Sequence, residues 1–262
     1  TFYAVNVSGS YTLQGGNLSA TNLSITGSLA HGNLNFNITG NMSIGAAASY
    51  SSGTGLIRFS GAGASTFTTN GKSVEAVQCE KDLGVGVAIL DALNCRQLLL
   101  GTTGNFDAND FAVNIGAVAG NGDLDISTSG TVLMGNGIWN AKGNVNTSTM
   151  SGTLTKEGST LVMSGTGKTL NMVNGQQLNA LSITGSISPL QNLDVNSVSV
   201  SASGSINDSA NKNWLIHNGL TINPAASWTR GTGIVTVEAG NLDTNSKVLE
   251  GIVKSTNGDV TM

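Results

Sequence analysis

Apolar and polar residues alternate with a period of two along most of the chain. Around Ile25 the apolar positions alternate with Ser and Thr, and around Phe36 they alternate with Asn. Because successive side chains of a β-strand point to opposite faces, this alternation predicts short strands with one buried and one solvated face. We therefore expect Val198 and Val200 to be buried, while Ser199 between them faces solvent.

Turn-forming residues separate these strands at intervals of about 8–12 residues. Asn-Gly pairs, which supply the positive φ that tight turns need, stand at Asn70-Gly71, Asn121-Gly122, Asn174-Gly175, Asn218-Gly219 and Asn257-Gly258. The only mildly helical window is 76–100, and the sequence Gly-Val-Gly-Val at its centre opposes a helix. The chain is therefore predicted to be all-β.

Two all-β architectures fit short strands with regular turns, a parallel β-solenoid and a series of tandem β-sandwich domains. A sandwich core usually uses large aromatic side chains, and this chain has only 3 Trp, 3 Tyr and 6 Phe. Slim Val, Ile and Leu positions with abundant Asn suit stacked coils better. We expect a predominantly parallel β-solenoid, with tandem sandwiches as the alternative.

One long phrase occurs twice without a gap. Phe59 begins a Ser-Gly-x-Gly and Asn-Gly pattern that ends at Val74, and the same pattern runs from Met163 to Leu178, 104 residues later. Internal repetition of this kind indicates a chain built from copies of a supersecondary unit. It suggests an N-terminal cap or assembly segment at 1–49, a first repeat module at 50–153, and a second module with C-terminal strands at 154–262.

Composition narrows the class of protein. Only 10% of the residues are charged, against about 25% in ordinary domains, and Ser, Thr, Asn and Gly take their place. The formal net charge is −4, and Lys and Arg form no cluster, which argues against a nucleic-acid partner. No apolar run reaches the roughly 18–20 residues that span a bilayer.

Several features suit a protein exported from the cell. The chain starts at Thr1 without Met, which we interpret as a processed or excised part of a longer product. Seven Asn-x-Ser/Thr triplets are candidate glycosylation sites. They are Asn6, Asn17, Asn22, Asn37, Asn41, Asn146 and Asn207.

The two cysteines suggest a disulfide. The sequence Ala-Val-Gln-Cys-Glu around Cys79 is echoed by Ala-Leu-Asn-Cys-Arg around Cys95, 16 residues later. If one coil takes that many residues, the cysteines stack within disulfide distance and Glu80 stacks on Arg96. The pair would then indicate an oxidising, extracellular compartment. The alternative is two free buried thiols.

Acidic residues gather in two places, Asp107 with Asp110 and Asp123 with Asp125. Residues 123 and 125 of a strand share a face, and carboxylate pairs cleave polysaccharides on many parallel β-helices. The chain lacks the accompanying Gly-His-Gly and Arg-Ile-Lys motifs. We therefore favour turn caps or a polar face that binds Ca²⁺ weakly, with no other metal or cofactor.

Other candidate chemistry is sparse. The two histidines, His31 and His217, are far apart and form no metal-binding spacing. Trp139, Trp214 and Trp228 are candidate platforms for stacking sugars, although in so aromatic-poor a chain packing at coil corners is the favoured interpretation.

The chain resembles the repeat regions of phage tail-fibre and virion structural proteins and of bacterial or archaeal surface adhesins. The motifs that carry the resemblance are Gly-Thr-Gly-Leu-Ile-Arg-Phe-Ser-Gly at 53–61, Asn-Gly-Lys at 70–72, Gly-Asn-Phe-Asp-Ala-Asn at 104–109, Met-Gly-Asn-Gly-Ile-Trp at 134–139 and Trp-Thr-Arg-Gly-Thr-Gly-Ile-Val-Thr-Val at 228–237. The chain departs from that style in its two cysteines and in Glu157-Gly158-Ser159, which stands where Gly-Thr-Gly is expected. The resemblance implies a structural or adhesive role outside the cytoplasm and transfers no catalytic residues.

These observations predict a non-enzymatic structural protein, a segment of a fibre, filament or adhesin shaft. Its partners would be copies of itself, joined through open strand edges, and surface glycans. Thr1–Leu13 and Val248–Met262 are the expected contact segments. The alternative function is a polysaccharide-binding or polysaccharide-degrading tailspike-type β-helix with Asp123 and Asp125 at its centre.

Overall fold

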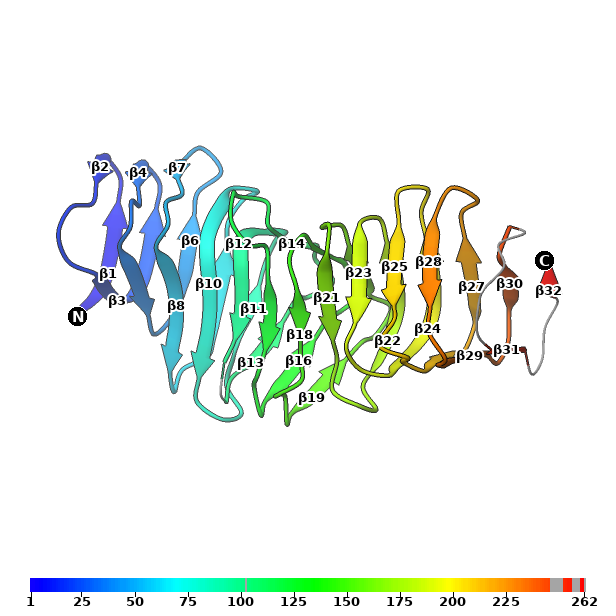
Figure 1. Cartoon of the computed structure of the whole chain (residues 1–262). Coiled ribbons are helices and arrows are strands. Elements are labelled where there is room, and N and C mark those ends of the chain that lie inside the picture. Colours follow the sequence, from blue (N-terminus) through cyan, green and yellow to red (C-terminus); the bar gives the residue numbers. More distant parts are fainter. Residues whose placement is uncertain (102, 246–251, 256–259, 262) are drawn as a thin grey trace.

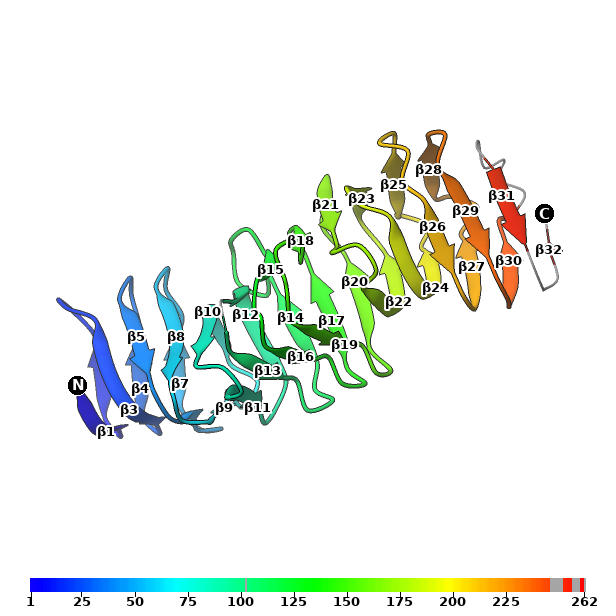
Figure 2. The same ribbon diagram turned by 90° about the horizontal axis from the view of Figure 1, so that it is seen from below.

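The computed structural model is a β-solenoid of about 11 turns, built from parallel strands stacked along one axis (Figure 1). It describes residues 1–101, 103–245, 252–255 and 260–261. The N-terminus and the C-terminus lie at opposite ends of the stack, as both views show (Figures 1 and 2). These residues are all strands, turns and loops, so they contain no apolar helix of membrane-spanning length. The expected fold class is confirmed.

Every strand pairing in the stack is parallel, and the pairings form columns that run along the axis. The first column begins at β1 (Phe2–Val7) and β3 (Leu18–Ile25) and continues through β6 (Met42–Ile44), β9 (Ser65–Thr68), β11 (Gly86–Ile89), β13 (Asn105–Asp107), β16 (Thr131–Leu133) and β19 (Thr153–Thr155). A separate three-stranded sheet, β2 (Ser10–Thr12), β4 (Ser28–Ala30) and β7 (Ser49–Ser51), flanks the first turns.

The second column also starts on β3 and extends almost to the C-terminal end. Its strands are β5 (Asn35–Ile38), β8 (Leu56–Gly61), β10 (Ser73–Lys81), β12 (Leu93–Leu100), β15 (Leu124–Ile126), β18 (Val145–Asn146), β21 (Lys168–Asn171), β23 (Ser186–Pro189), β25 (Ser205–Asp208) and β28 (Ser227–Arg230).

Two further columns complete the C-terminal part. One leaves β12 through β14 (Val113–Ile115), β17 (Ile138–Ala141), β20 (Thr160–Met163), β22 (Gln177–Ile183), β24 (Leu193–Val200), β27 (Gly219–Ile222), β30 (Asn241–Asp243) and β32 (Val260–Thr261). The other leaves the start of β24 through β26 (Trp214–Ile216), β29 (Ile234–Val237) and β31 (Ile252–Ser255).

The longest strands bend around corners of the coil and so belong to two columns. The first half of β12 pairs with β14 and its second half with β15. Inward and outward residues alternate along β12 except at Arg96 and Gln97, which both lie outside the core. The same doubling occurs at Asn196 and Ser197 of β24. Two successive outward residues therefore mark a corner, because each one shifts the phase of the alternation.

Alternating positions fill a continuous apolar core. Val198 and Val200 are buried and Ser199 is exposed, as the sequence predicted. At one corner the coils approach so closely that a Cβ on Gly53 would lie 1.6 Å from the carbonyl oxygen of Gly32. Only glycine fits there.

Successive turns differ in length, which changes the interpretation of the long repeat. Paired residues are 17 apart between Leu181 and Val198 and 26 apart between Phe106 and Val132. Phe59 lies in the second column, whereas Met163 lies in the column of β20, so the gapless 104-residue alignment does not superpose equivalent strands. The expected module boundaries at 49/50 and 153/154 fall within β7 and β19.

Candidate functional site

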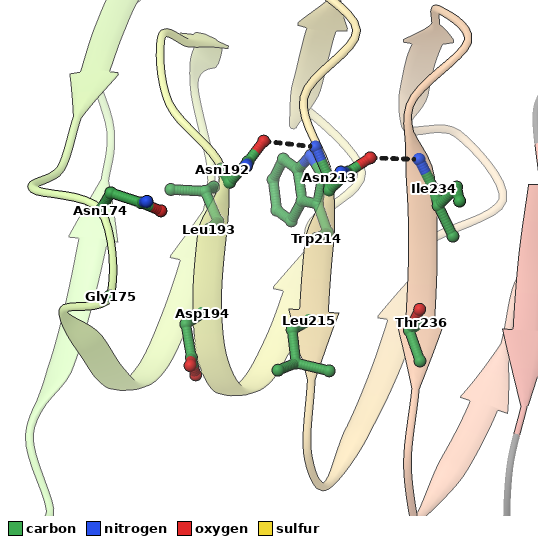
Figure 3. Close-up of a pocket in the computed structure, with 10 residues that line it drawn as sticks. All are labelled: Asn174, Gly175, Asn192, Leu193, Asp194, Asn213, Trp214, Leu215, Ile234 and Thr236. Atoms are coloured by element: carbon green, nitrogen blue, oxygen red, sulfur yellow. Dashed lines mark hydrogen bonds between the residues drawn. The ribbon is translucent and has the colours of Figure 1, made fainter.

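A groove lies on the outer surface of the C-terminal turns (Figure 3). Its volume is about 340 Å³, near the lower end of the roughly 300–1,000 Å³ typical of ligand pockets. Four successive turns contribute its lining, so the groove runs along the solenoid axis. The lining residues are Asn174, Gly175, Asn192, Leu193, Asp194, Asn213, Trp214, Leu215, Ile234 and Thr236.

Strand register arranges most of these side chains in two parallel rows. Leu193, Trp214 and Val235 pair across three turns and point into the core. The residue before each forms one outward row, Asn192, Asn213 and Ile234, which we call the amide row. The residue after each forms a second outward row, Asp194, Leu215 and Thr236. The groove is the space between these rows.

Hydrogen bonds to the backbone fix the amide row (Figure 3). The Asn213 N–H donates to Oδ1 of Asn192 at 3.0 Å, and the Ile234 N–H donates to Oδ1 of Asn213 at 2.8 Å. Each amide oxygen is thereby committed to the next turn. The Nδ2 groups of Asn192 and Asn213 have no hydrogen-bond acceptor among the described residues and remain available as donors.

A carboxylate–imidazole–carboxylate ladder joins the second row. Nε2 of His217 lies 2.8 Å from Oδ1 of Asp194, and its Nδ1 lies 2.6 Å from Oε2 of Glu238. Both ring nitrogens must donate, which only imidazolium can do. Burial opposes that charge, but the hydrogen bonds from Asp194 and Glu238 outweigh it and raise the pKa of His217.

A buried N-terminal polar cluster comprises His31, Tyr50 and Glu75. Glu75 accepts three hydrogen bonds, from His31 Nδ1 at 2.6 Å, from the Tyr50 hydroxyl at 2.6 Å and from the Gly53 N–H at 2.6 Å. His31 stacks on Phe36 with ring centroids 3.7 Å apart, and its Nε2 is buried without a partner among the described residues. Burial, followed by the charge and hydrogen bond of Glu75, raises the pKa of Tyr50 strongly.

A buried C-terminal polar cluster comprises Asp208, Trp214 and Arg230. Nη1 of Arg230 donates to Oδ2 of Asp208 at 2.6 Å, and both side chains are fully buried. The same oxygen accepts from Nε1 of Trp214 at 3.1 Å, and the Arg230 guanidinium lies 5.5 Å from the centre of the Trp228 ring. Burial works against both charges, raising the pKa of Asp208 and lowering that of Arg230, while their mutual attraction opposes each shift.

Lys81 is a third charged side chain inside the coil. Its Nζ donates to the carbonyl oxygens of Thr39 and Ser60, each at 2.8 Å, so one ammonium group joins two earlier turns. Burial lowers the pKa of Lys81.

The expected cysteine register is wrong. Cys95 pairs with Val74, 21 residues earlier, and Cys79 pairs with Leu100, so the two cysteines do not stack. They belong to different columns, since Cys79 lies in the second half of β10 and Cys95 in the first half of β12. Both thiols are free and buried, and burial raises the pKa of Cys79 to about 12. The expected disulfide is not formed.

The expected ladder pair of Glu80 and Arg96 is also wrong, for the same reason of register. Glu80 forms an ion pair with Arg58 instead. Arg96 donates to the carbonyl oxygens of Thr54 and Gly55 at 2.9 and 3.0 Å.

The acidic residues lie where turn caps are needed. Oδ1 of Asp107 accepts from the Asn109 N–H at 2.8 Å, and Oδ1 of Asp110 accepts from the Asn136 N–H at 2.7 Å. Asp123 likewise accepts from the Asn144 N–H. This arrangement agrees with the favoured interpretation of these carboxylates. In the part of the chain that the structure describes, no group of three or more His, Cys, Asp or Glu side chains could hold a metal ion.

Asp125 shares the outward face of β15 with Asp123, as the alternation predicted. Its Oδ1 accepts from Nδ2 of Asn146 at 3.4 Å. Burial, with a smaller contribution from Asp123, raises the pKa of Asp125.

Two of the three tryptophans cannot stack on sugars. Trp139 and Trp214 are 0% and 1% exposed, and Nε1 of Trp139 donates to the Met134 carbonyl. Trp228 is partly buried, and its ring centroid lies 4.9 Å from that of Trp214. Packing within the coil, the favoured interpretation of the sequence, accounts for all three.

The candidate glycosylation sites all lie on outward faces. Asn6, Asn17, Asn41 and Asn207 are exposed, and Asn22, Asn37 and Asn146 are half-buried. Several already bond to the next turn, as where Oδ1 of Asn22 accepts from the Asn41 N–H at 2.9 Å.

Sequence reasoning missed the groove altogether. One signal was present, because Trp214, Leu215 and Ile216 place three apolar residues in succession where alternation requires a polar middle residue. An apolar residue in the outward phase, Leu215, marks a surface that is not simply solvated. Comparison of the chain with protein-family models, curated proteins and solved structures found no match.

Proposed function

We propose that this chain is a non-enzymatic structural protein, a shaft segment of an extracellular or virion fibre, filament or adhesin. The observation that carries the proposal is the open edge of the first turn. Among the described residues, β1 pairs only with β3 and β2 pairs only with β4, so each strand leaves one edge without a partner. An unpaired strand edge is a template for another strand.

Exposed aromatic side chains surround that edge. Phe2, Tyr3 and Tyr11 are 61%, 83% and 56% exposed, although the chain is poor in aromatic residues overall. A second copy of the chain would cover both the unpaired backbone groups and these rings. The expected N-terminal contact segment, Thr1–Leu13, contains all of them. The other expected segment, Val248–Met262, lies largely outside the described residues.

Assembly is the direct test of this proposal. Electron microscopy and sedimentation velocity of the native chain should show fibres or concentration-dependent oligomers. Tyr3→Lys combined with Tyr11→Lys should give monomers, because charge at an edge opposes strand addition. Leu83→Lys is the matched control, since Leu83 is 71% exposed but lies away from the edge, and it should still assemble. A native chain that stays monomeric at high concentration contradicts the proposal.

The competing function is polysaccharide cleavage at Asp123 and Asp125. A carboxyl with a raised pKa beside a second carboxylate is a feature of many glycosidases, and Asp125 has such a pKa. A screen of bacterial capsular and plant polysaccharides for cleavage separates the two functions. Depolymerase activity that disappears in Asp123→Asn would replace the structural proposal with an enzymatic one.

A further inference from the structure

The C-terminal groove presents an unusual combination of groups for the surface of this coil. The amide row carries two fixed Asn side chains whose oxygens are already used. Opposite them, Asp194 has one oxygen committed to His217, and its Oδ2 has no donor among the described residues. Leu215 and Ile234 add apolar surface, with Ile234 40% exposed. Donors, an acceptor and apolar carbon surface therefore face one elongated space.

The lining excludes several classes of ligand. It contains no Lys or Arg, and Asp194 with Glu238 brings two carboxylates against the single charge of His217, so an anionic ligand would be repelled. A purely apolar ligand would bury the Asn amides and the Asp194 carboxylate without partners, which costs free energy. The remaining class is an uncharged molecule that accepts and donates hydrogen bonds and has apolar C–H surface.

The direction of the groove adds a constraint on length. Equivalent donors on Asn192 and Asn213 come from adjacent turns, which parallel strands hold about 4.8 Å apart. A ligand that meets both must extend along the solenoid axis and repeat its hydrogen-bonding groups. A chain of neutral sugar units satisfies each of these requirements.

We propose that this groove binds a neutral oligosaccharide lying along the solenoid axis. The Nδ2 groups of Asn192 and Asn213 donate to its oxygens, Asp194 accepts from a hydroxyl, and Leu215 contacts the sugar face. His217 is a positioning residue, because it holds the Asp194 carboxylate in place. This site is distinct from the tryptophans considered above, and it does not depend on whether copies of the chain assemble end to end.

Binding can be tested with cellohexaose, maltohexaose and chitohexaose as neutral probes and polygalacturonate as the anionic comparison. We expect at least one neutral probe to bind with a Kd below about 1 mM and to shift the side-chain amide NMR signals of Asn192 and Asn213. Leu215→Arg and Thr236→Arg, which fill the groove from outside the core, should each weaken binding at least about tenfold, roughly 1.4 kcal/mol.

Matched variants keep the test specific. Thr229→Arg places the same side chain on an exposed residue of β28, outside the groove, and should leave binding unchanged. Asp194→Asn should weaken binding by removing an anionic acceptor, while retaining the shape of the wall. The far-UV circular dichroism of every variant should match that of the native chain. Lack of saturable binding by all three neutral probes, equal binding in the filled variants, or a preference for polygalacturonate would overturn the proposal.

Discussion

The N-terminal and C-terminal polar clusters both hold charged side chains inside the coil, but their contacts differ. In the C-terminal cluster, Asp208 and Arg230 are register partners in adjacent strands of a single column. In the N-terminal cluster, Glu75 of β10 reaches Tyr50 of β7, which belongs to the separate three-stranded sheet. One cluster therefore reinforces a stack that strand pairing already holds, and the other joins two sheets that do not pair.

The difference predicts which polar groups are replaceable. A buried ion pair can often be exchanged for apolar residues of similar volume without loss, whereas removal of one partner leaves an uncompensated charge. Glu75 has a further duty, because it is the acceptor for the backbone N–H of Gly53. An apolar residue in place of Glu75 would leave that N–H buried without an acceptor, so the N-terminal cluster should not tolerate such an exchange.

The largest expected effect is at the C-terminal cluster. Arg230→Met leaves Asp208 as a buried carboxylate without its cation, and it should lower the free energy of unfolding by about 3–5 kcal/mol. Asp208→Leu combined with Arg230→Met should cost less than Arg230→Met alone. Urea unfolding followed by tryptophan fluorescence measures both, and a double variant less stable than the single one would contradict the comparison.

A smaller loss is expected when Glu75 is changed. Glu75→Gln keeps one acceptor oxygen but turns an amide N–H₂ toward groups that are themselves donors, which should cost about 1–3 kcal/mol. Glu80→Gln is the control on the same strand, because Glu80 is partly exposed and pairs with Arg58 at the surface. It should change the unfolding free energy by less than about 1 kcal/mol. Equal effects of the two substitutions would show that the N-terminal cluster does not join the sheets.

Alkaline pH should weaken the N-terminal cluster. The pKa of Tyr50 is raised in the folded chain, so the folded state keeps a proton that the unfolded state loses above about pH 10. Stability should therefore fall as pH rises through that value. Tyr50→Phe should cost about 1 kcal/mol at neutral pH and make the alkaline decline shallower. Unfolding free energies of both chains between about pH 8 and pH 11 provide the measurement.

The smallest expected effect is at the exposed ladder around His217. Its folded pKa is raised, so its stabilising contribution is complete below the unfolded value of about 6.5 and disappears as pH rises through the folded value. The contribution should be less than about 1 kcal/mol, because the side chain is 28% exposed and solvent screens it. NMR titration of the His217 ring should give a pKa above 6.5. His217→Gln should remove the pH dependence, and a normal or lowered ring pKa would contradict the ladder.

Alternation predicted the fold because a period of two assigns each residue to the inside or the outside of a strand. It also contained an unused signal for the buried charges. His31 shares the inward phase of Leu29, Lys81 that of Cys79, and Asp208 that of Ile206. A charged residue in the inward phase of a strand indicates a buried polar contact, although its partner lies some 20 residues away and cannot be identified from local sequence.

Turn length was the quantity that the sequence did not predict. The echo around Cys79 and Cys95 implied coils of 16 residues, but the strands there pair at 21. Strand patterns look alike on every side of the coil, so a local echo does not distinguish one side from the next. The groove depends on the same missing information, because its two rows exist only once Asp194, Leu215 and Thr236 are placed in register.

Parallel pairing throughout the stack has a mechanical consequence. The hydrogen bonds between strands point along the solenoid axis, so a pull on the two ends loads every bond of one turn together. Rupture between any two turns would create two fresh strand edges that match each other. A side chain that bonds to turns on both of its sides, such as His217, works as a rivet across such a fracture plane. A shaft of this construction would break cleanly and would be able to rejoin where it broke.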